Sequence, residues 1–235
     1  MLNINGNYEQ NLFLNKHPNK KLIRLTEKQL QFLIESDLIT TSEKLEIVEL
    51  SLGLRFLTEA ESSIKYQNQK RKDGFKYPTH TLKKLNDFLN IELPFPTNIS
   101  KRKSLRNENY IHVINIFANK AIKEYFEKFE KRISPLEIGI LYGYHPKAVL
   151  AFCGYIESCP PFKPTSAYQY YNSKIYPKDF IEEVDVYHKS KWEKIKNYCP
   201  QIIEIAEAEF KEKGIWFSSG QTDIYGARGQ TWTAD

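Results

Sequence analysis

Two acid–histidine pairs have the spacing that would place both side chains on one face of a helix. Asp185 and His188 stand three residues apart, and Glu108 and His112 stand four apart. A carboxylate beside an imidazole can transfer protons or bind a metal ion. A di-metal carboxylate bundle, however, requires paired Glu-x-x-His motifs and two further glutamates, and the sequence has no such set. Neither pair therefore identifies a catalytic residue.

Three cysteines and His145 are the other residues that could bind a metal ion. Cys153 and Cys159 are separated by five residues, whereas zinc ligands are usually separated by about two to four, and Cys199 lies far along the chain. We interpret the cysteines as free thiols. Dinucleotide-binding, P-loop and Gly-x-Ser-x-Gly motifs are absent as well. The sequence therefore predicts no catalytic, metal-binding or cofactor-binding residue.

Positive charge is concentrated in residues 65–106. This segment has eleven Lys or Arg and three Asp or Glu, whereas the whole chain has a net charge of +5. Such a segment can attract nucleic-acid phosphates, or it can be a solvated surface without a ligand. The candidate nucleic-acid-binding residues are Lys101, Arg102, Lys103, Arg106 and Lys147.

The stretch 134–155 has the pattern of two short helices joined by a tight turn. Ser134 is a natural N-cap, Pro135 suits the first helical position, and Glu137 would complete a capping box. Gly143 can adopt the left-handed conformation that ends the first helix, and Pro146 can begin the second. The same plan is typical of a DNA-binding helix-turn-helix.

The composition of the second helix favours a structural role for this hairpin. Base edges are read by polar side chains, and "PKAVLAFCGY" offers only Lys147 for that purpose. Small Gly139 would allow close helix packing, and Tyr144, Val149 and Phe152 are expected to face inward. We assign a structural role to Ser134, Pro135, Glu137, Gly139, Gly143, Tyr144, Pro146, Val149 and Phe152.

The pattern E-I-G-x-x-x-G-Y-x-x-x-A-V-x-A-F, which runs from Glu137 to Phe152, resembles a motif of uncharacterised archaeal and anaerobic-bacterial proteins grouped as domains of unknown function. The similarity extends through "AYQYYNSKIY" and "VYHKSKWEKIKNYC", so it covers roughly residues 134–199. Those families have no assigned activity. The resemblance therefore implies packing roles for the glycines and aromatic residues, and no functional residue.

The remaining patterns predict a mainly α, multi-helix bundle-like fold. A capping box at Thr40 and Glu43 should begin a helix that runs to about Ile64. Further helices are expected over 81–89 and 107–133, and from Pro200 to Gly214. The tyrosine-rich segment 168–176 is interpreted as a short strand, a hairpin or a packed loop.

We expect five parts along the chain. They are a loose N-terminal arm (1–20), an N-terminal helical part (21–93), a Pro-containing basic linker (94–106), a C-terminal helical domain (107–214) and a loose tail (215–235). The N-terminus lacks the basic and apolar regions of a signal peptide, and no apolar run approaches the roughly 18 residues of a membrane span. The sequence therefore predicts a cytoplasmic protein without a membrane association.

These observations favour a non-enzymatic binding or interaction module, with a protein as one possible partner. A nucleic-acid-binding protein that uses the hairpin at 134–155 and the basic segment at 65–106 is the first alternative. Its binding to nucleic acid would be weak. An enzyme whose site leaves no linear signature is the second alternative.

Overall fold

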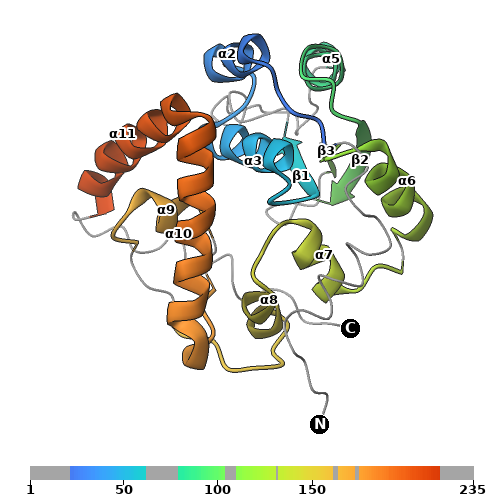
Figure 1. The fold of residues 1–235 in the computed structure, drawn as a ribbon. Coiled ribbons are helices and arrows are strands. Elements are labelled where there is room, and N and C mark those ends of the chain that lie inside the picture. Colours follow the sequence, from blue (N-terminus) through green and yellow to red (C-terminus); the bar gives the residue numbers. More distant parts are fainter. Residues whose placement is uncertain are drawn as a thin grey trace, which may run out of the picture. The chain divides into compact units, whose positions relative to one another are not determined.

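The computed structural model describes residues 22–61, 79–103, 110–130, 132–160, 164–172 and 175–217. The chain divides into two compact units, Met1–Pro146 and Lys147–Asp235, and each is described by itself. Most of the described residues are helical, and the described strands form one small antiparallel sheet (Figure 1). The mainly α class predicted from the sequence is therefore confirmed.

The first unit combines helices with a three-stranded sheet. Its strands are β1 (Leu57–Glu61), β2 (Thr97–Lys103) and β3 (Tyr110–Phe117), in the spatial order β1-β3-β2 with both pairs antiparallel. The described helices are α2 (Glu27–Glu35), α3 (Thr41–Leu52), α5 (Thr79–Asp87) with a π-helical turn at Phe88–Glu92, α6 (Lys120–Phe129) and α7 (Pro135–Leu141).

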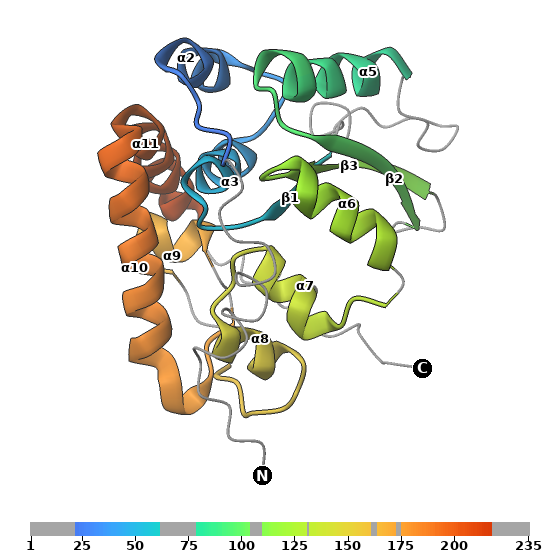
Figure 2. The ribbon, with the colours of Figure 1, turned by 45° about the vertical axis from the view of Figure 1, so that its right-hand side comes forward.

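The central strand β3 is covered on both faces, which is why buried apolar residues occur on both sides of the strand. Ile116 and Phe117 point to opposite faces of the sheet, and both are fully buried. Helix α6 lies along the face of Phe117, where Ile122 and Phe126 pack against that ring (Figure 2). This packing forms the core that holds α6 and α7 on the sheet.

The second unit is helical in its described part. Its elements are α8 (Pro146–Phe152), α9 (Ala167–Tyr171), a 3-10 turn at Lys178–Phe180, α10 (Ile181–Tyr198) and α11 (Pro200–Phe217). The short helix α9 contacts both α10 and α11. Buried Trp192 on α10 stacks on Tyr171 of α9, with 6.3 Å between ring centroids. None of the described helices has the length and apolar character needed to cross a bilayer.

The helix predicted after Thr40 begins as expected and ends early. Glu43 donates its backbone N–H to Thr40 Oγ1 over 3.3 Å, and the Thr40 N–H donates to the Glu43 carboxylate over 2.7 Å, so the capping box is confirmed. The extension to Ile64 is wrong. Gly53 adopts a left-handed conformation with φ of 71° that ends α3, and strand β1 begins at Leu57.

The helix predicted over 107–133 is also wrong. Residues Tyr110–Phe117 form strand β3, and α6 begins only at Lys120. Val113, Ile114 and Ile116 are β-branched residues that pack well in a sheet buried on both faces. Asn119 then caps the new helix, because its Oδ1 accepts a hydrogen bond from the Ile122 backbone N–H over 3.0 Å.

Three smaller expectations also need correction. Residues 97–103, which make up most of the expected linker 94–106, form strand β2. The segment expected to hold a strand near 168 is helical at α9, where Tyr170 N–H donates to the Ser166 carbonyl over 3.1 Å. Helix α11 continues past Gly214 to Phe217. The arm 1–20 and the tail from residue 218 lie outside the described residues.

Candidate functional site

The two helices of the stretch 134–155 end in the same way, with a Gly-Tyr pair. At the end of α7, Gly143 has φ of 73°, and Tyr144 N–H donates to the Gly139 carbonyl over 3.1 Å. At the end of α8, Gly154 has φ of 75°, and Tyr155 N–H donates to the Leu150 carbonyl over 2.9 Å. Both ends are Schellman motifs, which hold the tyrosine backbone in a defined position.

The first of these turns is packed tightly against the segment between α3 and β1. A Cβ atom added to Gly143 would lie 2.6 Å from the Leu54 carbonyl oxygen and 2.7 Å from Arg55 Cβ. Phe56 N–H also donates to the Leu141 carbonyl over 2.8 Å. The end of α7 is therefore part of the structural core of the first unit.

A buried ionic cluster lies at the same place. Arg55 is 6% exposed, and its Nε donates to Glu49 Oε2 over 2.6 Å. Its Nη1 lies 3.0 Å from Glu46 Oε2 and donates to Thr58 Oγ1 over 3.1 Å. Burial opposes the charge of Arg55, but Glu46 and Glu49 outweigh it, and the guanidinium pKa is raised above its ordinary value. Arg55 thus joins α3 to β1.

Tyr144 reaches this cluster from the turn after α7. The residue is 41% exposed, and its hydroxyl group lies close enough to Arg55 and the glutamates of the cluster to be affected by their charges. Burial raises the pKa of that hydroxyl, Arg55 lowers it, and the surrounding glutamates raise it further. With 41% of its surface exposed, Tyr144 does not face inward as expected, although its hydroxyl group lies near the ionic cluster.

The second Gly-Tyr turn is open. No atom of the described residues lies within 4 Å of a Cβ built on Gly154, Tyr155 is 73% exposed, and Phe152 is 52% exposed. The buried face of α8 consists of Ala148, Val149 and Ala151. The inward orientation expected for Val149 is confirmed, and that expected for Phe152 is wrong. The end of α8 instead presents two aromatic side chains to solvent.

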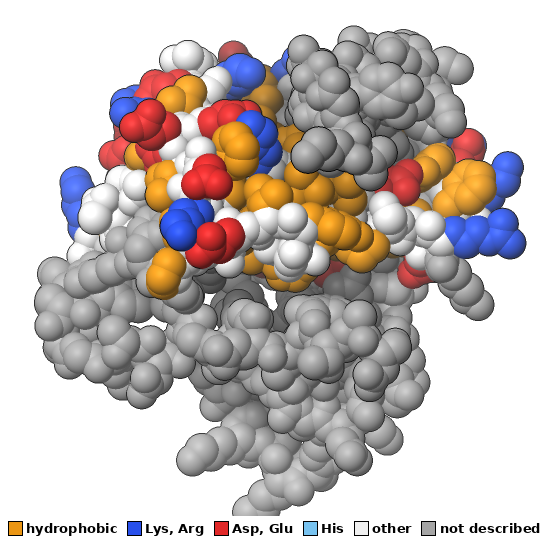
Figure 3. Space-filling model, turned by 90° about the horizontal axis from the view of Figure 1, so that it is seen from below, with side chains coloured by type: hydrophobic (Ala, Val, Ile, Leu, Met, Phe, Trp, Pro, Cys, Tyr) orange, Lys and Arg blue, Asp and Glu red, His pale blue; other side chains and the backbone are white. Residues whose placement is uncertain are grey.

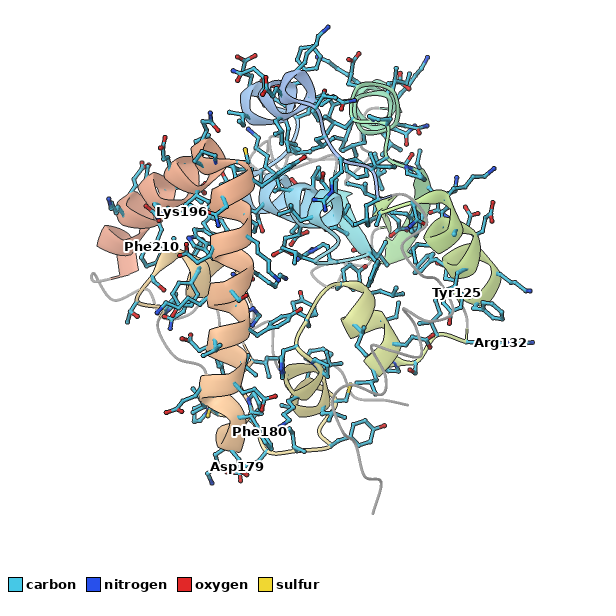
Figure 4. The ribbon with its side chains drawn as sticks, viewed as in Figure 1. Tyr125, Arg132, Asp179, Phe180, Lys196 and Phe210 are labelled. Atoms are coloured by element: carbon cyan, nitrogen blue, oxygen red, sulfur yellow. The ribbon has the colours of Figure 1, made fainter. Side chains whose placement is uncertain are left out.

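Lys147, the one candidate nucleic-acid-binding residue of α8, is held by its own unit. Its Nζ lies 2.8 Å from Glu183 Oε2 and 3.4 Å from the centroid of the Phe180 ring. Phe180 and Asp179 lie at the N-terminal end of α10 (Figure 4). A lysine engaged in an ion pair and a cation–π contact would have to break both to bind a phosphate. The structure therefore gives no support to Lys147 as a DNA contact.

The basic candidates of the first unit occupy an edge strand. Lys101, Arg102 and Lys103 are the last residues of β2, which among the described strands pairs only with β3. Arg106 lies outside the described residues, as does much of the basic segment at 65–106. Lys101, Arg102 and Lys103 belong to the first unit, whereas Lys147 belongs to the second.

In the structure, Asp185 and His188 each contact a tyrosine side chain of their own unit. Tyr168 OH donates to Asp185 Oδ2 over 2.9 Å, and Gln169 Nε2 donates to Asp185 Oδ1 over 3.3 Å. Burial and this hydrogen bond raise the pKa of Tyr168. His188 is 1% exposed and packs edge-on against Tyr176, with 6.1 Å between ring centroids. The pair Glu108 and His112 does not share a helix, because residue 112 lies in β3 and residue 108 is outside the described part.

The metal-binding hypothesis also lacks a geometric basis. Cys153 and Cys159 are half-buried, Cys199 is 1% exposed, and all three are free thiols. Burial raises the pKa of the Cys153 and Cys199 thiols, which disfavours the thiolate form that binds metals. Over the part of the chain that the structure describes, no three His, Cys, Asp or Glu residues are grouped as metal ligands.

Glu137 does not form the second half of the predicted capping box. Ser134 Oγ accepts the Glu137 backbone N–H over 3.2 Å, but the Glu137 carboxylate accepts a hydrogen bond from Tyr125 of α6. Burial, this hydrogen bond and the carboxylate charge raise the pKa of Tyr125 from 10.0 to about 12. The hydrogen bond ties α7 to α6.

The stability of the first unit should depend on Tyr125 at alkaline pH. The unfolded chain loses the tyrosine proton near pH 10, whereas the folded chain keeps it to about pH 12. This contribution is fully present below pH 10 and is lost as pH rises through the folded pKa. Urea denaturation of wild type and Tyr125→Phe across this range should show a steeper alkaline loss for wild type. Parallel curves would contradict the assignment.

Comparisons with known proteins do not assign a function to any of these sites. No protein-family model matches the chain, and no curated protein or solved structure is significantly similar to it.

Sequence reasoning missed the two sites that the structure makes most distinct. The role of Arg55 was not predicted, because its carboxylate partners Glu46 and Glu49 lie on α3, and the sequence pattern wrongly predicted that this helix continues past Arg55. The exposed aromatic pair at the end of α8 did leave a signal. The Gly-Tyr of 143–144 recurs at 154–155, and the recurrence predicts a second helix end with a tyrosine just beyond it.

Proposed function

We propose that the protein is a non-enzymatic binding module whose second unit binds a protein partner through Phe152 and Tyr155. The observation that supports this is their exposure, 52% and 73%, on a turn fixed by Schellman hydrogen bonds. Tyr and Phe are enriched in protein interfaces, and Tyr is among the residues that most often contribute a large share of the binding energy. A turn that is already ordered loses little conformational entropy when it binds.

The charges near this turn favour an apolar protein surface over a nucleic acid. Lys147 pairs with Glu183, and Lys178 lies 3.1 Å from Glu157 Oε1. Both of these lysines are thus paired with a glutamate of the same unit. Exposed hydrophobic side chains lie among charged ones on the face of the molecule drawn in Figure 3. We therefore expect a partner with an apolar, uncharged patch that accepts two aromatic rings.

The test combines capture with affinity measurement. Proteins retained by the wild-type chain from its host should be purified, and their affinity measured for wild type and for Phe152→Ala with Tyr155→Ala. The double variant should bind at least about tenfold more weakly while its melting temperature stays close to that of wild type. Val186→Ala, which trims another exposed apolar side chain of the unit, is the matched control.

Two results would contradict this proposal. One is that no retained protein distinguishes wild type from the double variant. The other is tight binding of duplex DNA or RNA at physiological salt that is lost on Lys147→Ala, because that outcome would favour the nucleic-acid-binding alternative.

A further inference from the structure

Strand β2 lies at an edge of the sheet in the first unit. In the spatial order β1-β3-β2 its inner side pairs with β3, and no other described strand lies along its outer side. Residues Thr97–Lys103 pair with β3 in unbroken register, so the strand contains no bulge. A regular edge strand of this length can accept a further strand on its outer side.

The register shows which backbone groups of β2 face outward. Phe117 N–H donates to the Pro96 carbonyl over 2.9 Å, directly before the first pair of the ladder, Thr97 with Ile116. Hydrogen-bonded and non-hydrogen-bonded pairs alternate along an antiparallel ladder. Every second residue of β2, beginning with Asn98, therefore directs its N–H and C=O groups toward β3. The residues that direct these groups outward are Thr97, Ile99, Lys101 and Lys103.

Ile99 adds an exposed apolar side chain to this edge. It lies near the middle of β2 and is 48% exposed. Thr97 points to the same face of the sheet, but it is buried and donates its Oγ1 to Asn86 Oδ1 of α5 over 2.8 Å. Helix α5 thus covers the first residue of the strand and leaves Ile99 exposed. An added strand would gain both hydrogen bonds and an apolar contact at this residue.

The charge of β2 favours an acidic strand. Its last three residues are Lys101, Arg102 and Lys103, and they belong to the segment 65–106, which has eleven Lys or Arg and three Asp or Glu. Lysine on an edge strand disfavours pairing with another copy of the same protein. Opposite charges placed across from each other on neighbouring strands stabilise the pair. The same lysines therefore favour a partner strand that carries Asp or Glu.

The backbone chemistry of the edge favours a polypeptide over a nucleic acid. Each outward-facing residue of β2 offers one N–H donor and one C=O acceptor. A second polypeptide strand offers the same two groups at the same spacing. Phosphate oxygens only accept hydrogen bonds, so a phosphate backbone would give the outward C=O groups no donor.

We infer that the outer edge of β2 binds an acidic, extended segment of a partner protein by antiparallel strand addition. In this orientation the partner residue opposite Lys103 comes first along the chain, the one opposite Lys101 comes two positions later, and the one opposite Ile99 two positions after that. The matching segment therefore has the order acidic-x-acidic-x-apolar, with these three side chains on one face. This surface belongs to the first unit and does not depend on the aromatic turn of α8.

Peptide probes test the edge on the full wild-type chain. Calorimetric titration with acetyl-Thr-Glu-Thr-Glu-Thr-Val-Thr-amide should show saturable binding. N-methylation of the second glutamate and the valine removes two N–H groups that would face β2, and it should weaken binding at least about tenfold. N-methylation of the two threonines that precede these residues changes only the opposite side of the peptide and should leave the affinity unchanged. The two probes have the same charge, so simple attraction to the basic segment cannot distinguish them.

A matched pair of variants locates the site on β2. Ile99→Pro removes the outward N–H of residue 99 and keeps the hydrogen bonds to β3, because proline is tolerated on an edge strand where its nitrogen faces outward. Ile99→Ala removes most of the side chain but keeps that N–H. Ile99→Pro should bind the parent peptide at least about tenfold more weakly than Ile99→Ala. The N-methylated probes need no variant, so they test the edge even where a substitution prevents folding.

Four results would overturn the inference. They are no binding of the parent peptide, equal binding of the two N-methylated probes, equal binding by the two variants, and displacement of the peptide by single-stranded DNA at physiological salt. A wild-type dimer that Ile99→Pro dissociates would also overturn it, because a second copy of the chain would then occupy this edge.

Discussion

Replacing Gly143 by alanine should destabilise the first unit by about 3 kcal/mol. The left-handed conformation at φ of 73° costs any residue with a Cβ about 1 to 2 kcal/mol. The new methyl group would also lie 2.6 Å from the Leu54 carbonyl oxygen, which belongs to the backbone and cannot rotate away. Overpacking of this kind adds about 1 to 3 kcal/mol.

Gly154→Ala is the control for this experiment. Gly154 has nearly the same conformation, with φ of 75°, but no atom of the part that the structure describes lies within 4 Å of a Cβ built there. Its replacement should cost only the conformational term of about 1 to 2 kcal/mol. Urea denaturation followed by circular dichroism should place the Gly143→Ala midpoint well below that of Gly154→Ala. Equal midpoints would show that the contact with the 53–56 segment is unimportant.

Tryptophan fluorescence can show in which unit the loss of stability caused by Gly143→Ala occurs. Trp192, Trp216 and Trp232 all belong to the second unit, Lys147–Asp235. Gly143→Ala should therefore shift the circular dichroism transition more than the fluorescence transition wherever the two units unfold separately. Coincident shifts would show that the units unfold cooperatively.

The helix ends were predictable from the sequence because capping chemistry is local. Thr40 with Glu43, and Ser134 before Pro135, place their helix starts correctly because each signal needs only the next three residues. Gly143 ends α7 for the same reason. Local hydrogen bonds determine these boundaries, so the sequence contains the information.

The sheet was not predictable in the same way. Ile111, Ile114 and Ala118 recur with helical spacing, yet the segment pairs with β1 and β2 as a strand. A strand buried on both faces loses the polar–apolar alternation that would distinguish it. The residues that it pairs with lie 7 to 19 positions away in β2 and 52 to 60 positions away in β1, so the pairing is a tertiary effect that local spacing does not show.

The candidate sites also differ in whether local sequence or tertiary structure determines them. The tyrosine turn at Gly154 is a local motif that the sequence shows directly. The outer edge of β2 depends on strand register, because a shift of one residue would turn the N–H and C=O groups of Ile99 from the outer side toward β3. The spacing of Ile99, Lys101 and Lys103 along the chain does not show this.

Removing the charge of Arg55 should destabilise the first unit by about 3 to 5 kcal/mol. Arg55→Met keeps most of the side-chain volume but leaves the Glu49 carboxylate, 4% exposed, without its buried counter-charge. An unpaired buried charge costs far more than the loss of a surface ion pair. The midpoint of urea denaturation measures the effect, and Lys120→Met, at an exposed ion pair on α6, is the control.

A second substitution distinguishes loss of an ion pair from loss of packing. Glu49→Leu in the Arg55→Met background removes the carboxylate that Arg55 pairs with in wild type. Well-packed apolar residues often replace a buried ion pair with little loss of stability. The double variant should therefore recover most of the deficit of Arg55→Met. A double variant as unstable as Arg55→Met would mean that the aliphatic part of Arg55 and its hydrogen bond to Thr58, and not the charge pairing, stabilise the junction of α3 and β1.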